Sequence, residues 1–264
     1  NTVITAEPTL TTSSNNTSDA SGLYKSTATN TGKATYYFRG NVENNYVSFA
    51  GQTWRIVRVN EDGTIRIVMQ DGINSNANIA FNSNYNNYRY MYYTNSQAKL
   101  TLESWYQTNI GSKKDLASSV ASGNYYCEQA KAKYNDSWTS GSSATMNTYN
   151  KYAPDFKCSS DGNGKGVVNA SVGLLSYDEV VYAGGYRRQS NSNYYLNNSS
   201  IAWWTMSPAG FLSSNSYVWD VSPEGDIGNR YVGNVGRLRL VINLTANTQI
   251  FDGDGTKDSP FVVE

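Results

Sequence analysis

The stretch IAWWTMSP, residues 201–208, belongs to the part of the sequence that decides the fold. Its apolar and aromatic run predicts a buried strand, which we expect to end at Pro208 because proline cannot donate a ladder hydrogen bond. Further along, YVWDV at 217–221 predicts a short strand before a turn. The segment RLRLVINL at 237–244 starts with alternation and becomes continuously apolar, as is typical of a strand that enters the core.

Two pairs of side chains on these strands have predicted structural roles. Trp203 and Trp204 are adjacent and so point to opposite faces of a strand; we expect at least one in the core, while the other can line a surface. Arg237 and Arg239 share a strand face, where they can bind either a carboxylate of this chain or one of a ligand. We favour a structural ion pair with an acidic residue of the preceding segment, Asp220 or Glu224.

Outward toward the N-terminus, the sequence predicts a β-hairpin. The runs WRIVRV at 54–59 and TIRIVM at 64–69 lie on either side of an Asp-Gly pair. Such a pair between two β-branched runs favours a tight turn between antiparallel strands. Arg55 and Arg66 alternate with apolar neighbours, so we expect both on a solvated face of the sheet.

Two short helices are predicted between these groups of strands. Residues 96–110 carry apolar side chains at helical spacing, with Ser96 as the N-cap and Gly111 as the stop. Ser176 and Glu179 have the spacing of a capping box, and the apolar run after them ends at a Gly-Gly pair. We expect both helices to be amphipathic and to cover one side of a sheet.

These elements together indicate an α+β fold with mixed or antiparallel sheets, two short helices, long loops and paired terminal strands. Residues 1–22 are rich in Thr, Ser and Asn and predict a flexible or donor-like arm, of which residues 2–5 can pair as an edge strand. Residues 23–264 are expected to form a single domain. Within it, residues 113–166 are rich in Ser, Gly and Asn and predict a long excursion from the fold.

The composition excludes several functions. The chain has 264 residues, with 21 Lys and Arg against 21 Asp and Glu and no histidine. A zero formal net charge argues against general nucleic-acid binding, which needs a basic surface. Without histidine there is no Ser-His-Asp or Cys-His catalysis and none of the common zinc sites. No apolar run approaches the about 18 residues that a membrane span requires.

The cysteine content and the uncharged surface indicate an extracellular chain. Charged residues make up only 16% of the sequence, so Asn, Ser, Thr and Tyr must keep the surface hydrated. Cys127 and Cys158 are an even pair and predict one disulfide that closes the excursion, with two buried free thiols as the alternative. Because the sequence starts at Asn1, we expect a processed or trimmed extracellular segment.

A family resemblance rests on three of these segments. WWTMSP at 203–208, YVW at 217–219 with Gly225 after it, and GRLRLVINL at 236–244 resemble the last part of C-type lectin-like domains of the formylglycine-generating-enzyme type. That part of the family reads WW-x-x-SP, then G, then G-[VF]-R-P-[VA]. The chain departs from the pattern at Leu240, where the family usually has proline after arginine.

The chain is most similar to a branch of this family found on surface proteins of Gram-positive gut bacteria. In that branch the segments YYFRG at 36–40, GLL-x-x-DEV-x-x-AGG at 173–185 and GDGTKDSPF at 253–261 recur. The resemblance covers about residues 36–263. It implies a C-type lectin-like fold and a location on the bacterial cell surface.

The resemblance also bears on activity. Formylglycine-generating enzymes use reactive cysteines late in the domain, and this chain has none after Cys158, so that activity is not implied. Other relatives are binding proteins, including the variable proteins of diversity-generating retroelements, which vary loop residues between the WW-x-x-SP strand and the final arginine strand. Tyr, Trp, Ser and Asn in this region suit a binding surface. The ligand-binding candidates in loops 207–237 are Phe211, Ser213, Asn215, Tyr217, Trp219, Asp220, Asn229, Tyr231 and Asn234.

Two acidic stretches faintly resemble calcium loops. Residues 161–166 place Lys165 at an oxygen-donor position, which counts against them. The second stretch has no closing glutamate at the right spacing, and a tight turn explains it equally well. We therefore expect no cofactor, with calcium as a minor alternative at Asp252, Asp254 and Asp258.

Three functions follow from the sequence. The leading hypothesis is a non-catalytic, adhesin-like domain that binds a protein or glycan on another surface through loops 207–237. The alternative is a structural subunit of a pilus-like or other surface filament, assembled through residues 1–22. A carboxylate-based glycan hydrolase comes third, because no two carboxylates are paired by their spacing. We expect no nucleic-acid partner.

Overall fold

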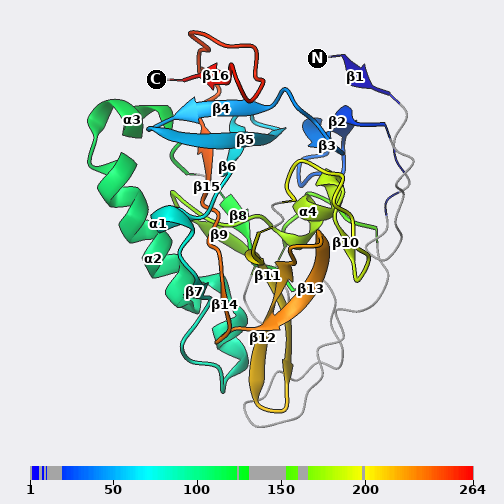
Figure 1. Cartoon of the computed structure of the whole chain (residues 1–264), viewed down its shortest axis with the longest axis vertical. Coiled ribbons are helices and arrows are strands. Elements are labelled where there is room, and N and C mark those ends of the chain that lie inside the picture. The colour runs from blue at the N-terminus through cyan, green and yellow to red at the C-terminus, as the bar shows by residue number, and fades with distance from the viewer. Residues whose placement is uncertain are drawn as a thin grey trace.

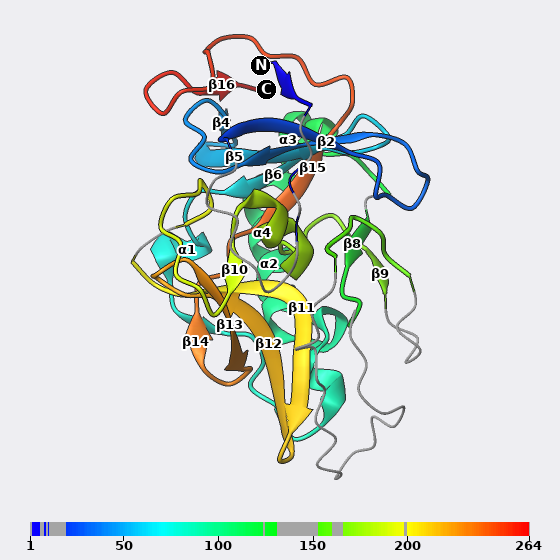
Figure 2. The ribbon, with the colours of Figure 1, turned by 90° about the vertical axis from the view of Figure 1, so that its right-hand side faces the viewer.

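The computed structural model describes residues 2–5, 8, 10, 20–123, 125–130, 153–159, 166–197 and 200–263. These residues form a mixed α+β fold in which strands predominate over short helices. A large sheet and a smaller one lie toward opposite ends of the molecule, with helix α4 (Tyr177–Ala183) between them (Figures 1 and 2). The α+β prediction is therefore confirmed at the level of fold class.

Within the described residues the large sheet has eight strands. They are β1 (Val3–Ile4), β2 (Gly22–Ser26), β3 (Thr35–Arg39), β4 (Tyr46–Phe49), β5 (Gln52–Val59), β6 (Ile65–Met69), β15 (Val241–Leu244) and β16 (Phe261–Val262). Strand β5 is central, with β6 along one edge and with β3 and β4 sharing the other edge. Strand β15 pairs antiparallel with β6, whereas β16 and β1 pair parallel with β4 and β2.

Several strand predictions for this sheet are confirmed. The predicted hairpin is β5 and β6, which pair from Trp54 opposite Met69 to Val59 opposite Ile65. The last strands of the chain, β15 and β16, join β6 and β4, which both lie within its first 70 residues. The first strand does not pair with them, because β1 lies on β2, as expected for an edge strand in residues 2–5.

The two hairpin arginines are not solvated, and that prediction is wrong. Arg55 and Arg66 are both buried. The Arg55 Nε donates to Asn45 Oδ1 at 2.7 Å and its Nη2 donates to the Val42 carbonyl at 2.6 Å. The guanidinium of Arg55 also lies 3.8 Å from the centre of the Tyr46 ring. Other segments cover this sheet, and they supply the polar partners that water was expected to supply.

The smaller sheet has the order β10 (Tyr186–Arg187), β13 (Asp226–Tyr231), β12 (Asn215–Val221), β11 (Trp203–Leu212). The strand predicted at 217–221 is confirmed as part of β12, and most of the rest of residues 207–237, expected as loops, also lies in strands. Pro208 does not end β11, contrary to our prediction. The register against β12 shifts on both sides of Pro208, between Trp204 and Gly210. Such an irregularity accepts proline because a bulged residue needs no ladder hydrogen bond.

Two further strand pairs connect parts of the chain. Strand β7 (Ile79–Ala80) pairs with β14 (Val235–Gly236), and β8 (Tyr125–Cys127) pairs with β9 (Val167–Asn169). Cys127 and Cys158 form a disulfide with Cα atoms 5.7 Å apart, which confirms the predicted bridge. Most of the predicted excursion at 113–166, including residues 131–152 and the calcium-like residues 161–165, lies outside the described residues.

Both predicted helices are present. Helix α2 (Gln97–Tyr106) begins after Ser96, whose side chain accepts a hydrogen bond from the Lys99 amide at 3.0 Å. It continues into a π-helical turn, η3 (Gln107–Gly111). The sequence did not indicate α1 (Ile73–Asn76), α3 (Lys114–Ser119), η1 (Tyr88–Met91) or η2 (Tyr93–Asn95). No helix in the described part of the chain is long and apolar enough to cross a membrane.

Helix α4 has the predicted capping box but not the predicted amphipathic character. The Ser176 hydroxyl accepts from the Glu179 amide and the Glu179 carboxylate accepts from the Ser176 amide. All seven residues of the helix are buried, since it lies between the two sheets instead of covering one outer face (Figure 2). Glu179 is buried with the rest of the helix, and its carboxylate belongs to a buried polar cluster that is described below.

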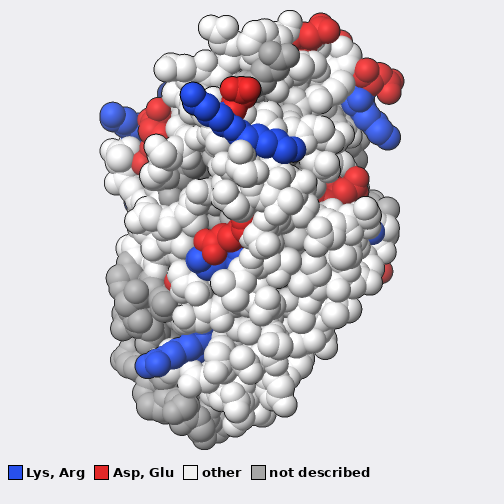
Figure 3. Space-filling model, turned by 90° about the vertical axis from the view of Figure 1, so that its left-hand side faces the viewer, with Lys and Arg blue, Asp and Glu red and all other residues white. Residues whose placement is uncertain are grey.

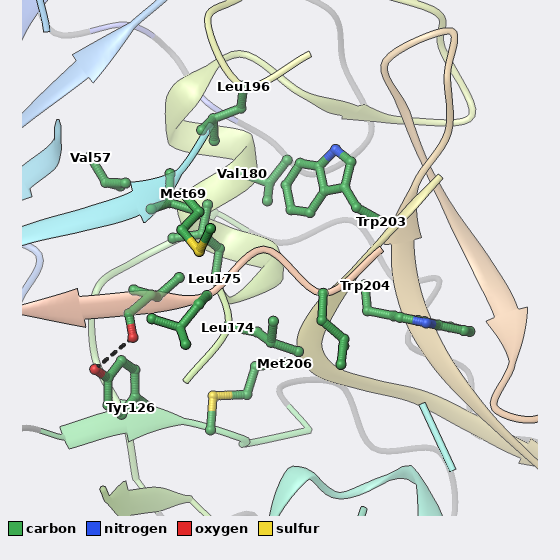
Figure 4. Close-up of a cluster of buried hydrophobic side chains, with 14 of the residues drawn as sticks. Val57, Met69, Tyr126, Leu174, Leu175, Val180, Leu196, Trp203, Trp204 and Met206 are labelled. Carbon is green, nitrogen blue, oxygen red and sulfur yellow. Dashed lines mark hydrogen bonds between the residues drawn. The ribbon is translucent and has the colours of Figure 1, made fainter. Parts of the chain in front are cut away.

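The main hydrophobic core joins both sheets. Trp203 and Trp204 of β11 are both fully buried, so neither lines a surface. Figure 4 shows Trp203 pointing toward Val180 of α4 and Trp204 pointing the other way. The Trp204 Nε1 donates to the Ile79 carbonyl at 2.9 Å, which satisfies its polar atom inside the core.

Candidate functional site

Four of the predicted binding residues lie on one face of the hairpin formed by β12 and β13. Tyr217 is opposite Tyr231, and Trp219 is opposite Asn229. Because side chains alternate along a strand and this pairing contains no register shift, all four project from the same face. In the described part of the molecule, the hairpin of β11 and β12 forms the end opposite the large sheet (Figure 1).

Tyr85, Tyr217 and Tyr231 form an aromatic group on this face, here named the tyrosine cluster. The Tyr85 and Tyr231 rings are 5.1 Å apart between centroids, and those of Tyr217 and Tyr231 are 6.2 Å apart, both in edge-to-face geometry. Such contacts contribute about 0.5 to 1.5 kcal/mol per pair beyond area burial. The rings therefore support one another while Tyr85 remains 44% exposed.

Tyr85 was not among the predicted residues. It is held beside the hairpin because the Ser216 amide donates to the Tyr85 carbonyl at 2.9 Å and the Ser216 hydroxyl donates to the Asn87 carbonyl at 2.6 Å. The signal in the sequence was the tyrosine-rich segment 85–93. Desolvation, with the Tyr85 phenol beside it, raises the pKa of Tyr231, which keeps its hydroxyl a neutral donor and acceptor.

The remaining polar candidates lie at the two ends of the hairpin strands. Ser213 and the neighbouring Ser214 form a two-residue turn between Leu212 and Asn215. Both serines have positive φ, at 49° and 63°, as a type I′ turn requires. Ser213 and Asn234 are exposed and Asn215 is half-buried. The part of the predicted site that is exposed or half-buried is therefore Ser213, Asn215, Tyr217, Asn229, Tyr231 and Asn234.

Three predicted binding residues are buried and do not belong to this surface. Phe211 lies in the core, and Trp219 is only 3% exposed, with its ring 4.8 Å from that of Tyr177. Asp220 is also buried, and its Oδ2 accepts from the Arg230 Nε at 2.6 Å. Desolvation raises the pKa of Asp220, and the charge of Arg230 opposes that change.

The ion pairs found among the described residues do not include the predicted ones of Arg237 and Arg239 with Asp220 or Glu224, and Asp220 binds Arg230. Arg239 is buried, and its Nε and Nη1 donate to the carbonyls of Met69 and Leu196 at 2.9 and 2.7 Å. Its guanidinium lies 4.8 Å from the Trp203 ring centre. Burial lowers the pKa of Arg239 to about 10, and the nearby positive charge of Arg55 acts in the same direction.

A buried polar cluster lies at the N-terminal end of α4, named here the α4 pocket. Glu179 accepts from Arg58 Nε at 3.2 Å, from Arg66 Nη1 at 2.5 Å and from the Ser176 amide at 2.9 Å. The two guanidiniums lower the pKa of Glu179 to about 2, against the desolvation that raises it. A carboxylate held ionised in this way binds the two guanidinium cations and is a poor proton donor near neutral pH.

The α4 pocket is too small for most ligands. Its cavity has a volume of about 30 Å³, and its lining includes Arg58, Arg66, Asp178, Glu179, Pro208 and Trp219. A cavity of this size holds on the order of one or two water molecules. The pocket therefore has a structural role: its lining joins residues of the large sheet to residues of the smaller sheet, among them Trp219.

The acidic residues of the calcium-like stretch make turn contacts. The Asp252 Oδ1 accepts from the Gly253 amide at 2.8 Å, and the Asp254 Oδ1 accepts from the Thr256 amide at 3.0 Å. These last contacts lower the pKa of Asp254. In the described ranges, no three acidic or cysteine side chains, Asp258 included, are grouped so that they could hold a metal ion.

Comparison with family models, with curated proteins and with solved structures finds no match for this chain. The tyrosine cluster and the α4 pocket are therefore interpreted from their own geometry. Of the two, only the tyrosine cluster offers an accessible surface that a macromolecule can reach.

Proposed function

We propose that this chain is a non-catalytic binding domain of the C-type lectin-like type, displayed on the outside of a bacterial cell, with the tyrosine cluster at the centre of its binding surface. The observation that carries the proposal is the group of Tyr85, Tyr217 and Tyr231 on the hairpin face, in which Tyr85 is exposed and the other two rings are half-buried. Tyrosine rings fixed by their neighbours give contact area at a low cost in conformational entropy. Serine and asparagine around them supply adaptable hydrogen bonds.

The family part of this proposal is supported by two segments that carry the sequence resemblance. The WWTMSP strand and the final arginine segment lie side by side. The Trp204 amide donates to the Arg237 carbonyl at 3.0 Å, and the Arg237 amide donates to the Ala202 carbonyl at 2.9 Å. The hairpin between these segments is the part that varies in the binding relatives, and in this chain it presents the tyrosines.

The test starts from a screen of the purified chain against arrays of extracellular proteins and glycans. The strongest interaction is then measured for the wild type and for Tyr217→Ala and Tyr231→Ala. Each substitution is expected to weaken binding about tenfold or more, as for central aromatic residues in other interfaces. Phe251→Ala is the matched control, because Phe251 is 60% exposed in the C-terminal segment that packs on β16. Equal affinity in all four proteins contradicts the proposal.

A second function, a filament subunit, is favoured by one observation. Residues of the predicted arm form β1, which adds to the exposed side of β2 as a parallel edge strand. Ile4 and Leu10 pack against the cluster of Tyr24, Tyr37, Phe156 and Tyr182. An arm that adds a strand to its own sheet can add the same strand to a neighbouring copy.

This second proposal is tested by light scattering and electron microscopy of the full chain and of a chain that lacks residues 1–22. Filaments are expected from the full chain at high concentration and are expected to be lost on deletion. Ile4→Asp in the full chain is the sharper variant, because it removes the apolar contact and leaves the arm length unchanged. A full chain that stays monomeric at high concentration contradicts assembly through the arm.

A further inference from the structure

A groove on another face of the molecule shares no residue with the tyrosine cluster. It runs along α2 and η3, and its volume is about 410 Å³. Its lining is Asn74, Gln97, Leu100, Thr101, Ser104, Trp105, Thr108 and Asn109. None of these side chains is ionisable, and six of them carry an amide or a hydroxyl. The lining, as far as the structure describes it, is therefore polar and uncharged and contains one tryptophan.

The helix turns part of this lining into hydrogen-bond acceptors. The hydroxyls of Thr101 and Thr108 donate to the backbone carbonyls four residues earlier, at 2.9 and 3.0 Å. The Nδ2 of Asn109 does the same at 2.8 Å. Each threonine hydroxyl has a single proton, so its remaining lone pairs, like the Oδ1 of Asn109, are left as acceptors. A ligand that brings hydroxyl donors matches this arrangement.

The backbone departs from regular geometry at the groove. Asn74 and Ser75 have φ of 51° and 54°, and Asn76 follows at 66°, so three successive residues are left-handed without a glycine. The Asn76 Oδ1 accepts from the Gly72 amide at 2.6 Å and holds this turn. The π-helical turn η3 carries Thr108 and Asn109. Both conformations are costly, and they are found most often where a protein places side chains for function.

Trp105 supplies the apolar part of the groove. Its ring is half-buried and packs against the main core, which fixes its orientation. A fixed aromatic face packs well against the C–H groups of a sugar ring, while the hydroxyls around the sugar's edge reach polar partners. Figure 3 views the molecule from the side on which α2 lies in Figure 1, and few charges are scattered over this face. The nearby Lys99 and Glu103 neutralise each other at 2.6 Å.

We propose that this groove binds a neutral oligosaccharide, with Trp105 stacked on a sugar ring and the oxygens of Thr101, Thr108 and Asn109 accepting from its hydroxyls. The described residues of the lining include no cationic side chain, which disfavours anionic sugars because a carboxylate or sulfate would lack a counter-charge among them. The groove adds a second ligand site to a chain whose tyrosine cluster serves another surface.

The experiment uses the full chain with cellohexaose, mannohexaose and chitohexaose as neutral probes and a galacturonic acid hexamer as the charged comparison. Binding is measured by calorimetry, and the bound sugar protons are mapped by saturation-transfer NMR. At least one neutral probe is expected to bind, and the charged one is not. Trp105→Ala is expected to weaken binding about tenfold, and Thr108→Val about threefold.

Thr108→Val keeps the shape of an exposed side chain, so it remains informative if Trp105→Ala unfolds the chain. The matched controls are Lys99→Gln with Glu103→Gln on the same helix and Tyr217→Ala in the tyrosine cluster, which are expected to bind the probe as the wild type does. Failure of all neutral probes at millimolar concentration overturns the proposal. The proposal is also overturned if Thr108→Val and Trp105→Ala both leave the affinity for the probe unchanged. It is overturned as well if Tyr217→Ala abolishes binding of the probe.

Discussion

Glu179 of α4 binds Arg66 of β6 at 2.5 Å, across 113 residues of sequence. Arg58 of β5 joins the same carboxylate at 3.2 Å, and the Ser176 amide donates to its other oxygen. One side chain therefore caps its helix and also ties that helix to two strands of the large sheet. All three charged groups are buried, so the arrangement has large consequences when one member is changed.

The first prediction concerns Glu179→Gln. This change leaves two buried guanidiniums without their anion, and loss of one member of a buried ion pair costs about 3 to 5 kcal/mol. We expect the free energy of unfolding in urea to fall by that amount. Glu103→Gln is the control, since its exposed pair with Lys99 is worth about 0.3 to 0.5 kcal/mol. Equal losses in the two variants would show that the buried pair is not special.

The second prediction is a loss of stability in acid. The pKa of Glu179 in the folded chain is about 2, below the ordinary glutamate value of 4.5. A carboxyl group with a lowered folded pKa stabilises the fold above its unfolded pKa and loses that contribution as pH falls through the folded value. Between pH of about 4.5 and 2, unfolding free energy should therefore drop by about 3 kcal/mol from this group alone.

This pH dependence is measured by urea unfolding at a series of pH values between those limits. Other carboxyl groups titrate in the same range, so the informative quantity is the difference between wild type and Glu179→Gln. That difference should shrink as the pH falls. A difference that stays constant down to the acid limit would be inconsistent with an ionised Glu179.

The same residues mark what can be predicted from sequence. Ser176 and Glu179 are three residues apart, and the capping box they form is a local pattern that the sequence carries in full. The burial of Arg66 depends on a helix 113 residues away, which no local pattern encodes. Alternation within β6 is the same for a solvated arginine and for one that is covered by another element.

The residues of the candidate surface also fall into those that the sequence identified and those that only the tertiary structure places. Tyr217 and Tyr231 were found because residue type and strand alternation agree with a binding face. Phe211 and Trp219 are also aromatic but are covered by neighbouring elements, and Tyr85 is brought to the site by tertiary contacts with Ser216 and Tyr231. These placements are set by tertiary packing, so composition alone could not separate exposed from buried aromatics.

The third prediction concerns the disulfide. Cys127 and Cys158 are 31 positions apart, and the bridge closes the loop between them. In the chain-entropy model such a closure stabilises by about 3 to 4 kcal/mol. The double variant with serine at both positions is expected to unfold at correspondingly lower urea concentration. Wild type in reductant should match the double variant, and a reductant effect that persists in the double variant would point to another cause.

The fourth prediction concerns the hairpin tip. Ser213 and Ser214 both lie in the left-handed region, where serine is less favourable than asparagine and glycine. The double change Ser213→Asn with Ser214→Gly supplies the residues that a type I′ turn prefers and should stabilise the chain by about 0.5 to 1 kcal/mol. A second double variant, Ser213→Val with Ser214→Val, should destabilise the chain, because β-branched residues disfavour positive φ.

Thermal unfolding monitored by near-ultraviolet circular dichroism checks this prediction. It reports the tertiary environment of the aromatic side chains as well as the transition temperature. The Asn-Gly variant should raise the transition temperature and leave the native spectrum unchanged, because the register between Leu212 and Asn215 already has a two-residue loop. A lower transition temperature would mean that the serines make contacts at the tip that outweigh their backbone strain. A changed spectrum would mean that the tip sets the geometry of Tyr217 and Tyr231.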